Sequence, residues 1–434
     1  MSSHALPLLT VAALQLWAAH TWAEGAASSD APAVLVRDDR ALARWVGSRS
    51  PDVEAGRAEL RAQRAAASGT RLYLNPTVDL GVGNVALGQT NPPDYPRSKT
   101  LQYNVGISQT VELGKRSPRI QAAELTATAA QARLQWTIAE RIGVARGALA
   151  ELIYATLRVQ QLDASLQEAR AAGLVAQGRL EHHDISGVDY DRMLIDFATL
   201  ETAHAHALAD AQMARAQCNA ALQAPCDVAG ADVADLDRAA PVPANPGPDI
   251  DLRDRADLRA LSSEAAASSE SAQLAAARAW PDLTFRLGYT HDAFTIAGSL
   301  ANSLSLSVAA PLPVFDRGQY AQNEALARAS QVRSLARAEQ VRAQGQLEGL
   351  YARKRAVEDA LKNLEEQTLP RANGVLEAEE LGLKEGQLDL NDLLLARRAA
   401  IAVRLQTLEL HYELFQVRNA LRQVLGLDQR LIEG

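Results

Sequence analysis

The chain has 434 residues, a formal net charge of −8 and only 4% aromatic residues. This composition disfavours a globular enzyme, whose core would need more large side chains. It also disfavours a nucleic-acid partner, because no basic stripe with interleaved aromatic residues is present. Alanine, leucine and arginine are abundant, and these residues favour helices because they lose little rotamer freedom in a helical backbone.

The N-terminus has the pattern of an export signal. An apolar run from Leu6 to Ala19 precedes Thr21-Trp22-Ala23, which fits a cleavage site before Glu24. The run is too short for a transmembrane helix, which needs about 20 apolar residues. We therefore expect residues 1–23 to be a signal peptide; a buried N-terminal helix is the alternative interpretation.

Two alternating segments follow a helical stretch over about 36–72. They cover about 76–85 and 101–111, each close to the length that a tilted strand needs to cross a bilayer. In the first segment, Val78 and Leu80 share one face, and small polar residues occupy the other. A half-buried soluble sheet gives the same alternation, but the serine and glycine side fits a water-filled lumen.

A long helical stretch runs from Pro118 to about Leu180, with no further proline, which corresponds to about 95 Å. Small and apolar side chains recur along it at three- and four-residue spacing, as in Leu125, Ala129, Ala132, Trp136, Ala139 and Ile142. This spacing indicates a narrow coiled-coil seam. Such helices suit the wall of a tube better than a solid core.

The long stretch turns between Gly178 and Gly187, and a further helix returns from the turn. His182-His183-Asp184 lies in this turn, but adjacent ligands on one turn make a poor metal site. We expect these three side chains to be solvated. Cys218 and Cys226 flank the end of the returning helix, and in an exported protein they form either a local disulfide or two unpaired structural thiols.

The second half of the chain repeats this order of elements. We expect a first repeat over 24–238, a proline-rich linker over 239–250 and a second repeat over 251–434, because the landmarks keep their order. The second repeat has strands at about 281–290 and 302–310. Its long helical stretch, from Gln319 to about Glu385, is interrupted only by Pro370, and its turn lies between Gly382 and Gly386.

Four strands cannot close a barrel, and an open sheet edge is not tolerated in lipid. The single chain is therefore incomplete, and oligomerisation follows from the physics of the edge. Three copies give about twelve strands, which lies within the known range for outer-membrane barrels.

The sequence resembles the TolC-like outer-membrane efflux proteins over nearly the whole mature chain. The resemblance rests on the order of several motifs: Asn75-Pro76, Arg255-Ala256-Asp257-Leu258-Arg259, Trp280-Pro281, Pro311-Leu312-Pro313-Val314-Phe315-Asp316-Arg317-Gly318, Leu369-Pro370 and Gly386-Gln387-Leu388-Asp389-Leu390-Asn391-Asp392-Leu393-Leu394. The overall pattern is most similar to the heavy-metal branch called CzcC-like.

The resemblance implies a mainly α fold with a transmembrane β-barrel. Each chain of a homotrimer would contribute four strands to a 12-stranded barrel in the outer membrane, and the barrel would continue into a periplasmic α-helical barrel. It also implies a periplasmic adaptor protein and an inner-membrane pump of the proton-driven RND class as partners. It implies neither a cofactor nor a catalytic site, and the residues show no arrangement typical of one.

The resemblance also implies a ring of acidic residues at the periplasmic aperture. Asp392 matches the first acidic position of that ring, whereas Leu395 stands at the second. Asp389 is a candidate for the missing charge, and Asp189 occupies the equivalent place in the first repeat. The alternative is that these carboxylates cap helix N-termini. Leu383 and Leu388 stand where the family archetype locks its tunnel, so any gate differs in detail.

The sequence therefore predicts a passive outer-membrane exit duct for metal ions or small toxic compounds, and not an enzyme. A type I secretion channel for proteins is the alternative in the same class, and a structural periplasmic coiled-coil protein is the alternative in another. Exposed turns on rigid helices are usual recognition sites. We therefore expect the turns bounded by Gly178 and Gly187 and by Gly382 and Gly386 to dock the adaptor.

Overall fold

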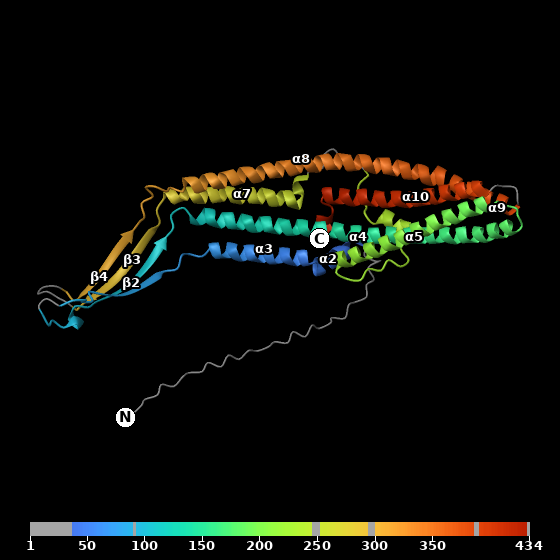
Figure 1. Cartoon of the computed structure of the whole chain (residues 1–434). Helices are drawn as coiled ribbons and strands as arrows, with labels where there is room; N and C mark the ends of the chain where they lie inside the picture. Colours follow the sequence, from blue (N-terminus) through green and yellow to red (C-terminus); the bar gives the residue numbers. More distant parts are fainter. Residues whose placement is uncertain (1–36, 90–92, 245–251, 294–299, 386–389, 432–434) are drawn as a thin grey trace, which may run out of the picture.

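Figure 1 shows an elongated molecule with a small sheet at one end and long helices that extend away from it. The structure is a computed structural model, and it describes residues 37–89, 93–244, 252–293, 300–385 and 390–431. The expected mainly α fold with a small antiparallel sheet is confirmed. The expected signal peptide, Asp389 and Gly386 lie outside the described residues.

The sheet is antiparallel throughout, with the strand order β1-β2-β3-β4. Its strands are β1 (Thr77–Gly83), β2 (Gln102–Val111), β3 (Leu283–Asp292) and β4 (Asn302–Ala309). The first half of the chain supplies β1 and β2, the second half supplies β3 and β4, and β2 pairs with β3 where the halves meet. Within the described chain, β1 and β4 each leave one edge without a strand partner.

The strand register gives the sheet one apolar face. Two rows of this face cross all four strands: Val78–Ile107–Leu287–Leu306 and Leu80–Val105–Tyr289–Leu304. Leu80 and Leu306 are each 76% exposed. Apolar surface in water costs about 25 cal/mol per Å², so a whole exposed face requires a non-aqueous neighbour.

The four helices next to the strands lie side by side in the same order as the strands. Two helices lead into strands, α3 (Pro51–Thr70) into β1 and α7 (Ala256–Ala276) into β3. Two helices follow strands, α4 (Arg116–Glu181) after β2 and α8 (Gln319–Asn363) after β4. Because α4 packs against α3 and α7, and α7 packs against α8, the helical layer has α3 and α8 at its edges (Figure 1).

The expected seam of α4 is visible in its burial. Ala129, Ala132, Ala139 and Ile142 are buried, while Leu125 and Trp136 are partly buried. The helix has 66 residues, which corresponds to about 99 Å. It contacts α3 and α7 near the sheet and α5 and α10 farther along, so its small side chains serve different neighbours in turn.

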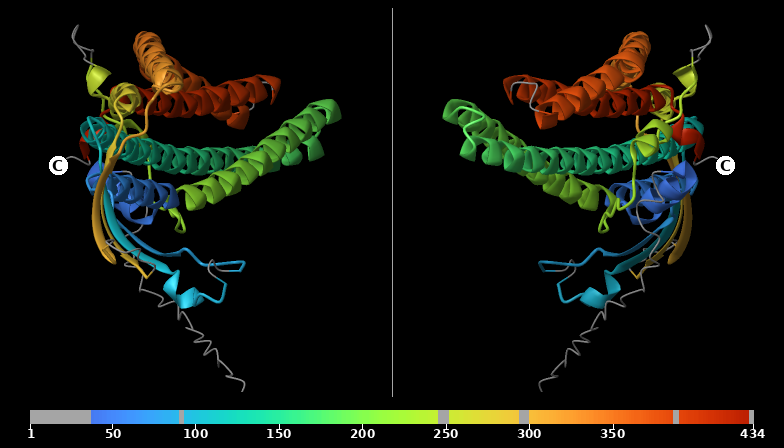
Figure 2. Two further views of the ribbon diagram at one scale, coloured as in Figure 1. Left: turned by 90° about the vertical axis from the view of Figure 1, so that its left-hand side faces the viewer. Right: turned by 90° about the vertical axis from the view of Figure 1, so that its right-hand side faces the viewer.

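Two helical hairpins form the end farthest from the sheet. α5 (Gly187–Leu222) returns along α4, and α10 (Leu390–Val424) returns along α9 (Leu369–Glu385). α10 also packs against α4, which joins the hairpins. In Figure 2, which looks along the molecule, the sheet is curved, and the far ends of the hairpins lean toward its concave side.

The irregularity near Pro370 is a π-helical turn. Residues Leu364–Thr368 form this turn between α8 and α9, and the Leu369 N–H donates to the Leu364 carbonyl, five residues back. Proline has no N–H, and its ring clashes with the carbonyl four residues earlier. The wider turn accommodates both effects, so the two helices join without a loop.

The turn between α4 and α5 is shorter than expected. Gly178 lies inside α4 and Gly382 inside α9, whereas Gly187 is the first residue of α5. Residues 182–186 alone connect α4 with α5, and there His183, with φ of 63°, adopts the left-handed conformation. Gly178 and Gly382 therefore do not bound the turns, because α4 and α9 continue through them.

The main core lies in the middle of the molecule, where α4, α5 and α10 meet the short helices α2 (Asp39–Arg49) and α6 (Val233–Arg238). Both halves contribute to it, for example through Ile142 and Phe415. Short 3-10 turns complete the chain at Arg97–Lys99, Leu252–Asp254, Ala277–Ala279 and Asp428–Leu431. None of the described helices is long and apolar enough to cross a membrane.

Candidate functional site

The face of the sheet opposite the apolar rows is polar and built from small residues. One row runs Asp79–Gly106–Gly288–Ser305, and the next toward the loops runs Gly81–Asn104–Thr290–Ser303. Hydroxyl and amide groups bond across the strands, as Thr290 does to the Asn104 side chain at 2.9 Å. Such a wall is compatible with water and with the passage of small hydrated solutes.

Exposed aromatic side chains flank the end of the sheet that faces the helices. Tyr73, Trp280 and Phe315 are 76%, 68% and 94% exposed, and Arg116 lies over the Tyr73 ring at 4.4 Å. Amphipathic aromatic rings gather where a membrane meets water. This group was not predicted from the sequence, although each residue stands within a few positions of a strand.

Asp189 is engaged in the cap of α5. Its N–H donates to Ser186 Oγ at 3.1 Å, and the Ser186 hydroxyl donates to Asp189 Oδ2 at 2.6 Å. Arg192 donates to the other carboxylate oxygen at 3.1 Å. The Asp189 carboxylate is therefore paired with two side chains, and the side chain that accepts a backbone N–H at this helix start is that of Ser186.

Asp392 stands in the first turn of α10 and is exposed. Among the described residues, no cation pairs with its carboxylate, in contrast to Asp189. The negative charge is therefore available to other copies of the chain or to passing ions. Asp389, its expected companion, is not described.

Ion pairs that the sequence analysis did not foresee join the two far hairpins. Arg398 of α10 pairs with Asp196 of α5, and Arg404 of α10 lies 3.4 Å from Glu168 of α4. The neighbouring Arg397 is 1% exposed and lies 3.8 Å from Glu380 of α9. Burial lowers the pKa of Arg397 against the opposing effect of Glu380. The signal in the sequence was an Arg-Arg pair inside an Ala/Leu helix.

His411 of α10 lies between two carboxylates. Its Nδ1 is 3.0 Å from Asp237 of α6, and its Nε2 is 3.0 Å from Glu365 of the π-helical turn. Burial alone would lower the pKa of His411, but the hydrogen bonds and charges of the two carboxylates outweigh it and raise the pKa. Both ring nitrogens donate only in the protonated form, so the geometry selects the cation.

Three charged side chains are buried together in the middle of the molecule, and the partly exposed Asp39 joins them. Asp428 Oδ1 lies 2.7 Å from Arg146 and 2.8 Å from Arg422, and both arginines also reach Asp39. Burial would raise the pKa of Asp428, but the two arginines hold it below its usual value. This network ties α2, α4 and α10 to the C-terminal 3-10 turn, so its role is structural.

The structure joins Cys218 to Cys226 by a disulfide. The bond ties the end of α5 to the segment that leads to α6, and both cysteines belong to the main core. Trp45 donates from its indole to the Leu222 carbonyl nearby, at 2.9 Å. The disulfide therefore stabilises the helix end.

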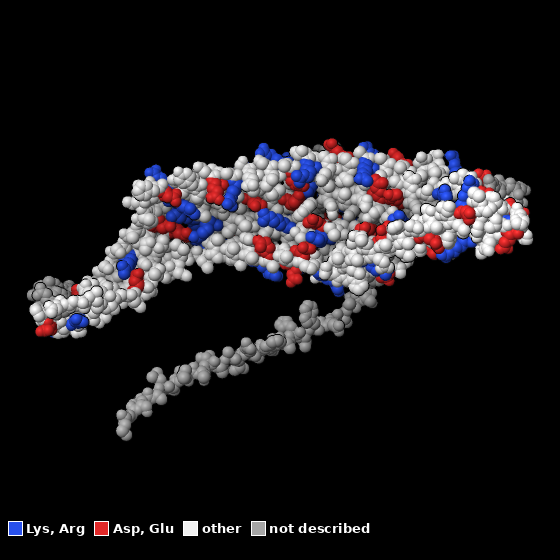
Figure 3. All heavy atoms as spheres, in the orientation of Figure 1, with Lys and Arg blue, Asp and Glu red and all other residues white. Residues whose placement is uncertain are grey.

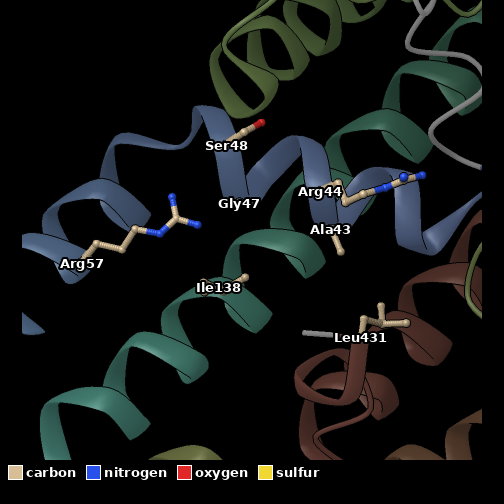
Figure 4. Close-up of a pocket in the computed structure, with 7 residues that line it drawn as sticks. All are labelled: Ala43, Arg44, Gly47, Ser48, Arg57, Ile138 and Leu431. Atoms are coloured by element: carbon tan, nitrogen blue, oxygen red, sulfur yellow. The ribbon is translucent and has the colours of Figure 1, made fainter. Parts of the chain in front are cut away.

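One surface recess lies near the middle of the described chain. The recess in Figure 4, of about 410 Å³, lies between α2, α3, α4 and the C-terminal turn. Arg44 and Arg57 lie on opposite sides of it, and no carboxylate, histidine or cysteine lines it. No group of metal-ligating side chains occurs in the described chain either, and His182 and His183 are exposed on their turn.

A four-stranded open sheet with an exposed apolar face, continued by a wall of long helices, defines a subunit of an outer-membrane channel. Charges are mixed over the helical part of the surface and sparse over the sheet (Figure 3). The comparisons with known proteins agree with this class. Residues 248–427 match the family model described as outer membrane efflux protein.

Over this segment the chain resembles the outer membrane efflux protein family. It is 28% identical over 339 residues to the cobalt-zinc-cadmium resistance protein CzcC of Cupriavidus metallidurans, a match that covers 76% of this chain and 77% of that protein. The sheet accordingly lies in the outer membrane, and the helices lie in the periplasm.

Solved channel structures share the fold. CusC, for which folding and transmembrane channel formation are described, has a TM-score of 0.76 at 14% identity, with 89% of this chain and 91% of that chain covered. The open-state MtrE outer-membrane channel of Neisseria gonorrhoeae has a TM-score of 0.74 at 18% identity, with 90% and 89% covered.

Proposed function

We propose that three copies of the chain close into one passive exit duct of a tripartite efflux system. The observation that supports this most is the agreement of the open edges. The sheet ends at β1 and β4, and the helical layer ends at α3 and α8 on the same two sides. Lipid does not tolerate unpaired strand edges, so β4 of one copy would pair with β1 of the next.

We propose divalent metal ions as the cargo, supported by the likeness to CzcC, whose name refers to cobalt, zinc and cadmium resistance. Deletion of the gene should lower the concentrations of Co²⁺, Zn²⁺ or Cd²⁺ at which cells grow, and the gene supplied in trans should restore them. Loss of tolerance only to drugs or detergents would contradict the metal cargo. Retention of a secreted protein inside the cells would favour the type I secretion alternative.

The partners in this proposal are a periplasmic adaptor and an inner-membrane RND pump, docked at the far hairpins. Asp184→Lys changes the charge of the 182–186 turn without touching a helix interior. We expect it to abolish export while the trimers stay intact on gels. Asp163→Lys, at an exposed position of α4 away from the turn, is the matched control and should export normally. Loss of trimers in Asp184→Lys alone would indicate a structural role of the turn.

Asp392 of the three copies would form the acidic ring of the periplasmic aperture. Its exposure and lack of a described partner support this role, whereas Asp189 is neutralised by Arg192. In planar bilayers, Asp392→Ala should reduce cation selectivity and block by divalent ions, and Asp189→Ala should change both much less. Unchanged selectivity and unchanged block in Asp392→Ala would contradict the assignment.

A further inference from the structure

One ion pair crosses the polar face of the sheet. Asp79 of β1 and Arg286 of β3 lie on either side of β2, and Arg286 Nε is 3.2 Å from Asp79 Oδ2. The strand positions around the pair are neutral and small: Ser108, Gly288, Ser305 and Ser307. Both charged side chains are about half exposed, at 44% and 47%, so they face the solvent on this side of the sheet.

Gly106 of β2 lies directly beneath the pair. A Cβ atom at this position would lie 2.8 Å from Asp79 Oδ2, closer than real Cβ contacts, and 3.0 Å from Arg286 Nε, a tight contact. The glycine therefore allows the carboxylate and the guanidinium to meet flat against the wall. With any larger residue here, the ends of these two side chains would have to shift.

Stability does not explain this pair well. Exposed ion pairs contribute little, because water screens them and two long side chains lose freedom. Two neutral residues would serve a barrel wall equally well in that respect. A charge on the wall of a narrow lumen, however, acts on every ion that passes within a Debye length, about 8 Å at physiological salt.

We propose that Arg286 is a specificity-determining residue of the duct, because it neutralises Asp79 and keeps the barrel wall from retaining divalent cations. The inference rests on the proposed function, in which three copies surround one lumen. Each copy would then contribute one Asp79–Arg286 pair to a ring near the helical end of the barrel. With Arg286 present, the ring has no net charge, and hydrated cations pass. Without it, three carboxylates face the lumen and hold them.

The test uses the full-length protein in planar bilayers at about 0.1 M KCl, where the Debye length is about 10 Å. All variants carry Asp392→Ala, so that the proposed aperture ring does not dominate. Arg286→Gln should shift the reversal potential toward cation selectivity and increase block by Cd²⁺ several-fold. Asp79→Asn should shift it toward anions. Asp79→Asn combined with Arg286→Gln should restore the parent values, and Arg286→Lys should leave them unchanged.

The effect should shrink at about 1 M KCl, where the Debye length is about 3 Å. Parent values of selectivity and Cd²⁺ block in both Arg286→Gln and Asp79→Asn, with normal trimers on gels, would overturn the inference while the duct stands. Absence of conductance in the wild-type protein as well would instead count against the proposed function itself.

Discussion

The middle of the molecule and the sheet at its end differ in how they treat apolar side chains. In the middle, a single chain buries its apolar side chains, a disulfide and a set of charges within its own fold. In the sheet, the same chain exposes two rows of large apolar side chains and leaves two strand edges open. One chain therefore covers its own apolar surface only in its helical part. In the proposed duct, lipid and further copies would cover the apolar face and the open edges of the sheet.

The largest loss of stability should come from disrupting the buried charges in the middle of the molecule. Asp428→Ala would leave Arg146, which is fully buried, and Arg422 without their shared carboxylate. Breaking a buried pair costs about 3–5 kcal/mol, so the thermal unfolding midpoint of the helical signal should fall clearly. Asp52→Ala removes the half-exposed partner of Arg141 and should cost less than about 1 kcal/mol. Equal effects of the two variants would contradict the distinction.

Neighbouring residues on the two faces of β4 should respond differently to the same charge. Leu306→Arg places a cation on the apolar face, which costs about 2–4 kcal/mol per copy near the bilayer midplane. Ser305→Arg places the same charge on the polar face. We expect the first variant to be depleted from the outer membrane in fractionation experiments and the second to assemble. Normal assembly of Leu306→Arg would mean that this face does not contact lipid.

A smaller, pH-dependent effect should come from His411. Its pKa in the folded protein is raised above the usual value of 6.5. Its contribution to stability is therefore fully present below about pH 6.5 and is lost as the pH rises through the folded-state value. His411→Gln should lower the free energy of unfolding by about 1 kcal/mol more at pH 6 than at pH 9. An equal loss at both values would show that the charge of His411 is not involved.

Local pattern was sufficient to predict much of the fold. Alternation identified the apolar face that contains Val78 and Leu80, and the three- and four-residue spacing in α4 identified the buried positions Ala129 and Ile142. Both are periodic signals over consecutive residues. The mainly α architecture and the outer-membrane channel class followed from them and from the order of the motifs.

Features that depend on distant pairing were not predictable in this way. Arg146 and Asp428 are 282 positions apart, and Asp79 and Arg286 are 207 apart. Each pair exists only once the packing of α4 or the register of three strands is known. The extent of the turn between α4 and α5 was also not predictable from Gly178, because a single glycine inside a helix costs only about 1 kcal/mol relative to alanine.

Closure through the β1 and β4 edges is the central claim, and engineered cysteines test it most directly. Within one chain, β1 and β4 are three strand spacings apart, about 14 Å, too far for a disulfide. Pairs combining Val78→Cys or Leu80→Cys with Leu304→Cys or Leu306→Cys can therefore link only different copies. We predict, for at least one pair, an oxidised ladder on denaturing gels that ends at three chains. A ladder that ends at another number, or bonded edges in no pair, would contradict it.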